Sequence, residues 1–116
     1  MKKYCLALDL QDDPALIAAY EEAHQRVWPE IIASIRDAGI ESMEIFRTHT
    51  RLLMVIEARD DFSFEKKAEA DRNNAQVQQW ETLMWRYQQA LPHAQPGQKW
   101  VLMEKIFDLH TYQSVG

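Results

Sequence analysis

The chain has 116 residues, 47% of them hydrophobic, and carries a formal net charge of −5 at pH 7. This length and composition suit one domain with a real core, so we expect residues 1–116 to form a single domain. The acidic balance argues against nucleic acid or an anionic membrane as a partner, because either would require a basic patch. Gly occurs only three times, which excludes Gly-rich phosphate-binding loops.

The single cysteine, Cys5, cannot form an internal disulfide and suits a reducing compartment. It lies among alternating apolar residues, so we interpret it as a small core hydrophobe. The apolar run at the N-terminus is too short for a signal peptide and is interrupted by Asp9. No segment has the length needed to cross a membrane. We therefore expect a soluble cytoplasmic protein.

The first half of the chain predicts a strand followed by a broken helix. Alternating apolar residues favour a β-strand over residues 4–10, and Pro14 is typical of a helix start. Pro29 lacks a backbone N–H and pushes Trp28 away from helical geometry, so we expect the helix to break near Trp28. A second helix then runs from Pro29 to about Ala38, and Gly39 follows as its C-terminal cap.

The second half predicts a hairpin, a long helix and a last strand. Residues 43–49 and 51–58 each favour a strand, and the few residues between them favour a tight turn. A helix is expected from about 62 to 90, with residues 73–74 as a point where it can be interrupted. Alternating apolar residues predict the last strand over 100–109.

The order β-α-β-β-α-β predicts an α+β, ferredoxin-like fold with an antiparallel four-stranded sheet and both helical layers on one face. The other face of the sheet carries too many apolar residues to be exposed to water, which indicates an interface. We therefore expect a homodimer through the sheet faces, a dimeric α+β barrel. The C-terminal segment 110–116 is expected either to reach over the partner subunit or to fray.

Three residues in the broken helix suggest a binding pocket. Tyr20, His24 and Trp28 recur at every fourth position, so their side chains share one helix face. Aromatic walls beside one group that titrates near neutral pH suit a sugar pocket with proton-transfer chemistry. The ordinary alternative is an aromatic core with a structural histidine. Pro29 favours the pocket, because a break in the helix leaves a concavity beside it.

The other three histidines, His49, His93 and His110, are expected at the surface, in a turn, in a loop and near the C-terminus. No spacing among them and the carboxylates is typical of metal ligands. We therefore expect no metal site.

Four segments of the chain resemble the L-rhamnose mutarotase family, and they span about residues 4–109. They are Y-x3-H-x3-WPE, IFRTHTRLLMVIE, QQWETLM and WVLMEKIFDL. The first is the most specific. The resemblance implies a dimeric ferredoxin-like fold that interconverts the α and β anomers of 6-deoxy-L-sugars without a metal or cofactor.

The resemblance also implies roles for individual residues. His24 falls at the proton donor and Tyr20 at a substrate-binding tyrosine. Trp80 falls at the first member of a Trp-Trp pair that lines the pocket. This chain has Glu81 at the second member and Met43 at a pocket tyrosine. Because these two departures exchange polar groups in the pocket, they could move selectivity from L-rhamnose toward L-fucose.

Mutarotation requires only acid–base chemistry, because the ring oxygen gains a proton as the anomeric hydroxyl loses one. His24 could protonate the ring oxygen. The base that accepts the proton of the anomeric hydroxyl could be a carboxylate such as Glu81, a tyrosine or a water. Trp28, Trp80 and Trp85 compete to stack on the apolar face of the sugar.

Two other functions fit the same pattern. Dimeric α+β barrels also include cofactor-independent monooxygenases, which would bind a planar aromatic substrate and could use His24 as a base. A non-catalytic sugar-binding module would use the aromatic stripe for recognition alone.

Overall fold

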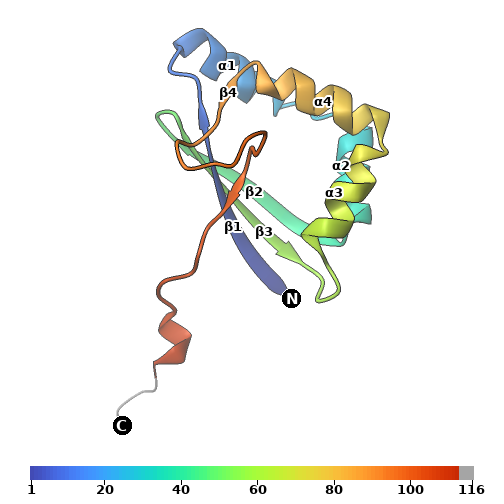
Figure 1. The fold of residues 1–116 in the computed structure, drawn as a ribbon, viewed down its shortest axis with the longest axis vertical. Helices are drawn as coiled ribbons and strands as arrows, with labels where there is room; N and C mark the ends of the chain where they lie inside the picture. Colours follow the sequence, from blue (N-terminus) through green and yellow to red (C-terminus); the bar gives the residue numbers. More distant parts are fainter. Residues whose placement is uncertain (113–116) are drawn as a thin grey trace.

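The computed structural model describes residues 1–112. Its elements are β1 (Lys2–Leu10), α1 (Pro14–Ala23), α2 (Pro29–Asp37), β2 (Ile40–Thr48), β3 (Arg51–Ala58), α3 (Phe64–Arg72), α4 (Ala75–Trp85), β4 (Gln88–Gln89), β5 (Val101–Leu102) and a short 3-10 helix (Leu109–Thr111). The strands form an antiparallel sheet in the order β2-β3-β1-β4, and β5 also pairs with β1. Helices α1 to α4 arch over one face of this sheet (Figure 1). The predicted ferredoxin-like α+β fold is confirmed.

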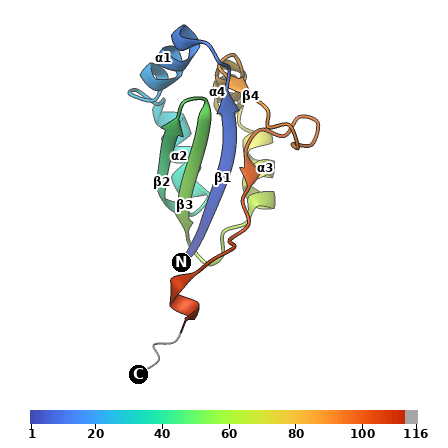
Figure 2. The same cartoon turned by 90° about the vertical axis from the view of Figure 1, so that its left-hand side faces the viewer.

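The two faces of the sheet follow from the strand register. Leu8 of β1 lies opposite Leu52 of β3, and both side chains are fully buried under the helices. The core on this face combines residues of the sheet with residues of α1, α2 and α4: Leu8, Leu10, Tyr20, Ile31, Leu52, Val77, Trp80 and Met84. Because side chains alternate along a strand, the neighbours of Leu8 point to the other face. Figure 2 shows that none of the helices within residues 1–112 covers that other face.

The open face carries an apolar patch. Ala7 lies opposite Leu53, and Leu53 lies opposite Phe46, so the three side chains form a row across β1, β3 and β2. Phe46 is 53% exposed. Cys5 is on this face and is half-buried opposite Val55, so its assignment to the core was wrong. Its place in the alternation of β1 puts it on the side away from the helices.

The first helix breaks where the sequence predicts, but over a wider segment. Helix α1 begins with Asp13, whose side chain accepts hydrogen bonds from two backbone N–H groups, and it ends at Ala23 with His24 as its C-cap. Helix α2 restarts at Pro29. Gly39 follows it with φ of +101°, a conformation that glycine adopts without strain. The break therefore leaves His24 at a helix end and not within a helix.

The predicted long helix is two helices, α3 and α4. Asn73 caps the end of α3, and the Asn74 side chain accepts hydrogen bonds from the N–H groups of Gln76 and Val77 to start α4. Helix α4 ends at Trp85, earlier than predicted, because the chain then turns to pair Gln88 with Leu10 of β1.

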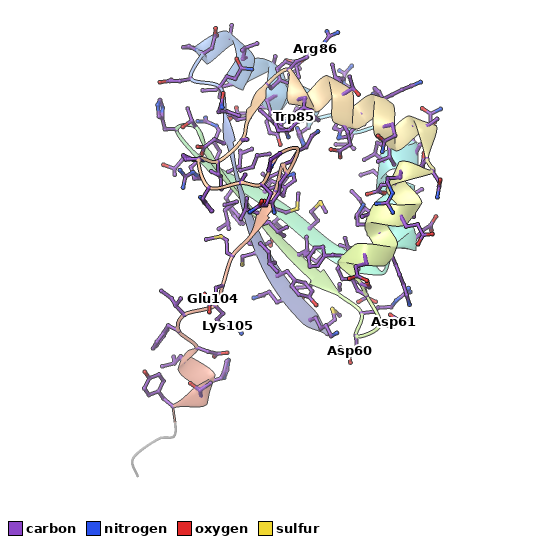
Figure 3. The ribbon with its side chains drawn as sticks, viewed as in Figure 1. Asp60, Asp61, Trp85, Arg86, Glu104 and Lys105 are labelled. Atoms are coloured by element: carbon purple, nitrogen blue, oxygen red, sulfur yellow. The ribbon has the colours of Figure 1, made fainter. Side chains whose placement is uncertain are left out.

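The predicted last strand is much shorter than expected. Val101 and Leu102 pair with β1, the N–H of Met103 donates to the Cys5 carbonyl at 2.8 Å, and the chain then leaves the sheet as an arm (Figure 1). Continuing this register would bring Lys105 opposite Lys3, and like charges at that position destabilise a strand pair. Lys105 instead pairs with Asp108 at 3.1 Å. Figure 3 shows Glu104 and Lys105 on this arm, well away from Asp60 and Asp61 at the end of β3.

The arm exposes apolar side chains to solvent. Ile106 is 93% exposed, Leu109 72% and Phe107 62%, and the ring centroid of Phe107 lies 5.5 Å from that of Tyr112. The expected behaviour of segment 110–116 lies partly outside the described residues. None of the helices in residues 1–112 has the length and apolar character needed to span a membrane.

Candidate active site

A cleft of about 840 Å³ lies between the helices and the face of the sheet that they cover. This volume lies in the range of pockets that hold small molecules. Five of the six residues predicted for the site line the cleft: Tyr20, His24, Met43, Trp80 and Glu81. The topology thus brings together α1, β2 and α4, which are far apart in the sequence.

His24 is held at the cleft by the end of α1. Its Nδ1 lies 2.9 Å from the backbone carbonyl oxygen of Tyr20. Because a carbonyl oxygen only accepts, Nδ1 carries a proton and donates it. Within residues 1–112, no group forms a hydrogen bond with Nε2. The ring is half-buried in the cleft wall, so Nε2 can exchange a proton with a bound molecule.

Tyr20 lies beside His24, with ring centroids 4.3 Å apart, and is only 4% exposed. Burial raises the pKa of Tyr20 to about 12, because the phenolate would lose its solvation. The side-chain amide of Gln88 opposes this rise by hydrogen bonding, and the negative charge of Glu81 adds to it. Tyr20 is therefore a neutral phenol at physiological pH, able to donate a hydrogen bond.

Trp80 forms the aromatic wall of the cleft. Its ring meets His24 edge to face at 5.7 Å and Trp28 at 5.1 Å. Trp28 is not among the residues that line the cleft, and it supports Trp80 through this contact. Of the three tryptophans that were expected to compete for a sugar, Trp80 alone faces the cleft.

Glu81 is paired with a lysine that sequence analysis did not single out. Lys99 Nζ lies 2.7 Å from both Glu81 Oε2 and the Glu81 carbonyl oxygen. Lys99 Nζ also lies 4.8 Å from the ring centroid of Trp85, a cation–π contact. Trp85 does not line the cleft; Figure 3 labels it near the end of α4. Within residues 1–112, Oε1 of Glu81 makes no hydrogen bond.

Met43 belongs to the apolar floor of the cleft, which β2 and β3 provide. Its partners in that floor are Ile45, Met54 and Ile56. A thioether there accepts hydrogen bonds only weakly, so this part of the cleft suits the apolar portion of a ligand.

The other three histidines are exposed, as predicted. His49 lies 3.5 Å from Asp12 in an exposed pair. No group of three or more His, Cys, Asp or Glu residues within 1–112 is placed to hold a metal ion.

A sequence model of the family described as L-rhamnose mutarotase matches residues 3–109. The chain belongs to the L-rhamnose mutarotase family. An L-fucose mutarotase from Xanthomonas campestris pv. campestris is 46% identical over 117 residues, which cover 99% of this chain and 94% of that protein. The family membership predicted from the sequence is confirmed.

Two solved structures share the fold of this mutarotase family member. L-rhamnose mutarotase from Formosa agariphila superposes with a TM-score of 0.70 at 20% identity, covering 94% of this chain and 99% of that one. Tetracenomycin F2 cyclase from Streptomyces glaucescens superposes with a TM-score of 0.59 at 21% identity, covering 93% and 96%. At these identities the likeness concerns the fold alone.

Sequence analysis missed three residues of this mutarotase-family site. Trp100 and Gln88 line the cleft, and Lys99 holds Glu81. Trp100 could have been found from the sequence, because it is the first residue of the alternating apolar segment that was predicted as a strand. Gln88 is one of five glutamines between residues 76 and 89, and nothing in its pattern distinguishes it from the exposed ones.

Proposed function

We propose that the protein is a mutarotase that interconverts the α and β anomers of a 6-deoxy-L-hexose. The observation that carries this proposal is the setting of His24, whose ring lines an aromatic-walled cleft while its Nδ1 is held by a carbonyl, which leaves Nε2 for a ligand. A proton carrier beside rings that can pack on a sugar is what anomer exchange needs.

The chemistry follows from the two protonation states of His24. Protonated Nε2 donates to the ring oxygen, the bond from that oxygen to the anomeric carbon breaks, and the anomeric hydroxyl loses its proton as the aldehyde forms. Rotation about the bond to the aldehyde carbon then exposes its other face. Closure reverses the proton transfers and yields the other anomer. General acid–base steps of this kind typically each contribute about 10²–10⁴-fold.

Glu81 is the proposed general base, since its carboxylate borders the cleft and Lys99 holds one of its two oxygens. The Glu81→Gln variant tests this assignment, because an amide keeps the shape and loses the basicity. We expect its exchange rate to fall by about 10²-fold or more. An unchanged rate would assign the base to a water instead.

L-fucose is the sugar we favour as substrate. The relative from Xanthomonas at 46% identity is named an L-fucose mutarotase. Met43 and Glu81 replace pocket residues that the resemblance to L-rhamnose mutarotases would lead one to expect, and both line the cleft. The exchange removes one hydroxyl and adds one carboxylate, which changes the hydroxyl directions that the pocket can satisfy.

Saturation-transfer NMR of anomer exchange, run with L-fucose and L-rhamnose at equal concentration, tests the proposal. We expect both sugars to exchange faster with the protein than without it, and L-fucose to exchange faster than L-rhamnose. A clear preference for L-rhamnose would overturn the choice of sugar. Binding of either sugar without any acceleration would indicate a sugar-binding module instead of an enzyme.

We also propose that the protein forms a homodimer through its open sheet face and is cytoplasmic. Support for the dimer comes from the apolar row of Ala7, Phe46 and Leu53 and from the exposed apolar side chains of the arm. An arm with apolar side chains this exposed could lie across a second copy, reciprocally about a twofold axis. The free thiol of Cys5 suits a reducing compartment.

A further inference from the structure

Gln88 is a buried polar residue with an unused hydrogen-bond acceptor. Its side chain is 5% exposed, and its Oε1 has no hydrogen-bond partner within residues 1–112. It is the only buried side-chain oxygen or nitrogen of the described residues in this state. Buried acceptors are almost always paired, so an unpaired one requires an explanation.

The position of Gln88 in the fold fixes the backbone from which this oxygen extends. Gln88 belongs to β4 and pairs with Leu10 of β1, so its backbone is fixed at the edge of the sheet. A neighbouring hydrogen bond, from the backbone N–H of Gln11 to the backbone carbonyl oxygen of Tyr87 at 2.9 Å, joins the same two segments. The backbone that carries the Gln88 side chain is therefore fixed beside the cleft.

The surroundings of Gln88 indicate where a partner would come from. Gln88 lines the same cleft as Tyr20, His24 and Glu81. The side-chain amide of Gln88 forms a hydrogen bond with the phenol of Tyr20. This bond uses the donor group of the Gln88 amide and leaves its acceptor, Oε1, free. Of its cleft neighbours, the carboxylate of Glu81 has no proton to donate, and Tyr20 already faces the amide. A hydroxyl group of a ligand bound in this cleft can supply the missing donor.

We propose that Gln88 is a substrate-binding residue whose Oε1 accepts a hydrogen bond from one hydroxyl group of the sugar. This inference rests on the proposed function, and it adds a specificity-determining group to it. An epimer that directs this hydroxyl elsewhere leaves Oε1 unpaired in the complex. A site built around a hydroxyl rejects a ligand without it strongly, because the buried acceptor then stays unsatisfied.

The residue next in sequence provides a matched control. Gln89 has the same side chain in the same two-residue strand, but it is exposed and does not line the cleft. The variants Gln88→Met and Gln89→Met therefore make the same chemical change at a buried and an exposed position. Met has a volume close to that of Gln and no strong hydrogen-bonding group.

The test is an NMR titration of the wild type and both variants with L-fucose and with its monofluorinated analogues, in which one hydroxyl at a time is replaced by fluorine. Fluorine cannot donate a hydrogen bond. We expect Gln88→Met to weaken binding of L-fucose by about tenfold and Gln89→Met to leave it unchanged. One analogue should bind the wild type and Gln88→Met equally, because it lacks the hydroxyl that donates to Gln88. The position of its fluorine therefore identifies that hydroxyl.

Thermal unfolding of the ligand-free proteins separates binding from a structural role. Gln88→Met removes an unpaired buried oxygen and also the amide hydrogen bond to Tyr20, so the two effects offset and its unfolding midpoint should stay close to that of the wild type. A lower midpoint together with equal losses for all analogues would overturn the proposal in favour of a structural role. So would a Gln88→Met variant that binds L-fucose as the wild type does.

A second variant covers the case in which Gln88→Met does not fold. Gln88→Glu keeps the shape and the acceptor, so it should keep the preference for the hydroxyl over the fluorine at the identified position. Loss of that preference would overturn the proposal. If the wild type binds and exchanges sugars while Gln88 has no effect, the proposed function stands and this inference alone fails. If the wild type binds no sugar, both fail.

Discussion

The backbone carbonyl oxygen of Tyr20 determines which ring nitrogen of His24 is available to a ligand. It accepts the proton of Nδ1 over 2.9 Å, so Nε2 is the nitrogen left for a ligand. The same residue presents its phenol to the cleft, buried and neutral. Tyr20 therefore contributes twice, by orienting the imidazole with its backbone and by offering a hydrogen-bond donor with its side chain.

The raised pKa of Tyr20 predicts a loss of stability at alkaline pH. The folded state holds the phenol proton up to about pH 12, whereas an exposed tyrosine releases it near pH 10. The contribution of Tyr20 is therefore complete below about pH 10 and is lost as the pH rises toward 12. Full loss corresponds to about 2–3 kcal/mol, at about 1.4 kcal/mol per pKa unit.

Denaturant unfolding of the wild type and of Tyr20→Phe across this pH interval measures the effect. The variant lacks the ionisable group, so its free energy of unfolding should fall less steeply. Parallel curves for the two proteins would contradict a buried, neutral phenol.

At the level of single residues, sequence analysis found the groups whose chemistry is unusual at their position. Tyr20 and His24 were predicted because a phenol and an imidazole share a helix face where aliphatic residues are common. Trp28 shares the spacing yet supports Trp80 from behind, because the helix ends at His24 and the stripe no longer continues. Gln88 could not be predicted, because its burial depends on a strand pair between distant segments.

Among the secondary-structure elements, α4 carries the most weight for the site, because it presents both Trp80 and Glu81 to the cleft. Its start depends on Asn74, whose side chain accepts hydrogen bonds from the N–H groups of Gln76 and Val77. Asn74→Ala should lower the free energy of unfolding by about 1 kcal/mol, the usual contribution of an N-cap.

Urea unfolding of Asn74→Ala beside Asn73→Ala checks this prediction. Asn73 is exposed, and its side chain donates one hydrogen bond to the Glu69 carbonyl at a helix end. We expect Asn73→Ala to cost less than Asn74→Ala. Equal or reversed costs would show that α4 does not depend on this cap.

Element predictions succeeded where the signal is local and failed where it depends on tertiary contacts. Pro29 and Gly39 mark the ends of α2 by their own backbone chemistry, and the structure has them there. The alternation over 100–109 predicted a strand, but Lys3 and Lys105 would meet on continuing the pairing, and the chain leaves the sheet. Strand β4 has two residues, too few for any period to be visible.

At the scale of the whole molecule, one face of the sheet is covered by helices and the other carries the row of Ala7, Leu53 and Phe46. If this face forms the proposed dimer interface, a charge in the row should separate the subunits. Phe46 is 53% exposed in the single chain, so Phe46→Glu should leave the fold of each subunit intact.

Analytical ultracentrifugation of Phe46→Glu and Ala33→Glu tests the interface. Ala33 is exposed on α2, on the covered side of the sheet, so its variant adds the same charge elsewhere. We expect a dimer for the wild type and Ala33→Glu, and a monomer for Phe46→Glu. A dimeric Phe46→Glu, or a monomeric wild type, would refute this interface.

The rate of L-fucose anomer exchange in wild type and His24→Asn, measured by saturation-transfer NMR, tests the central claim most directly. Asparagine can keep the hydrogen bond to the Tyr20 carbonyl and lacks the Nε2 that would carry the proton, while His49→Asn at an exposed histidine is the control. We predict that His24→Asn exchanges about 10²–10⁴-fold more slowly while still binding the sugar, and that His49→Asn matches the wild type. Exchange by His24→Asn at the wild-type rate would contradict the proposed mechanism.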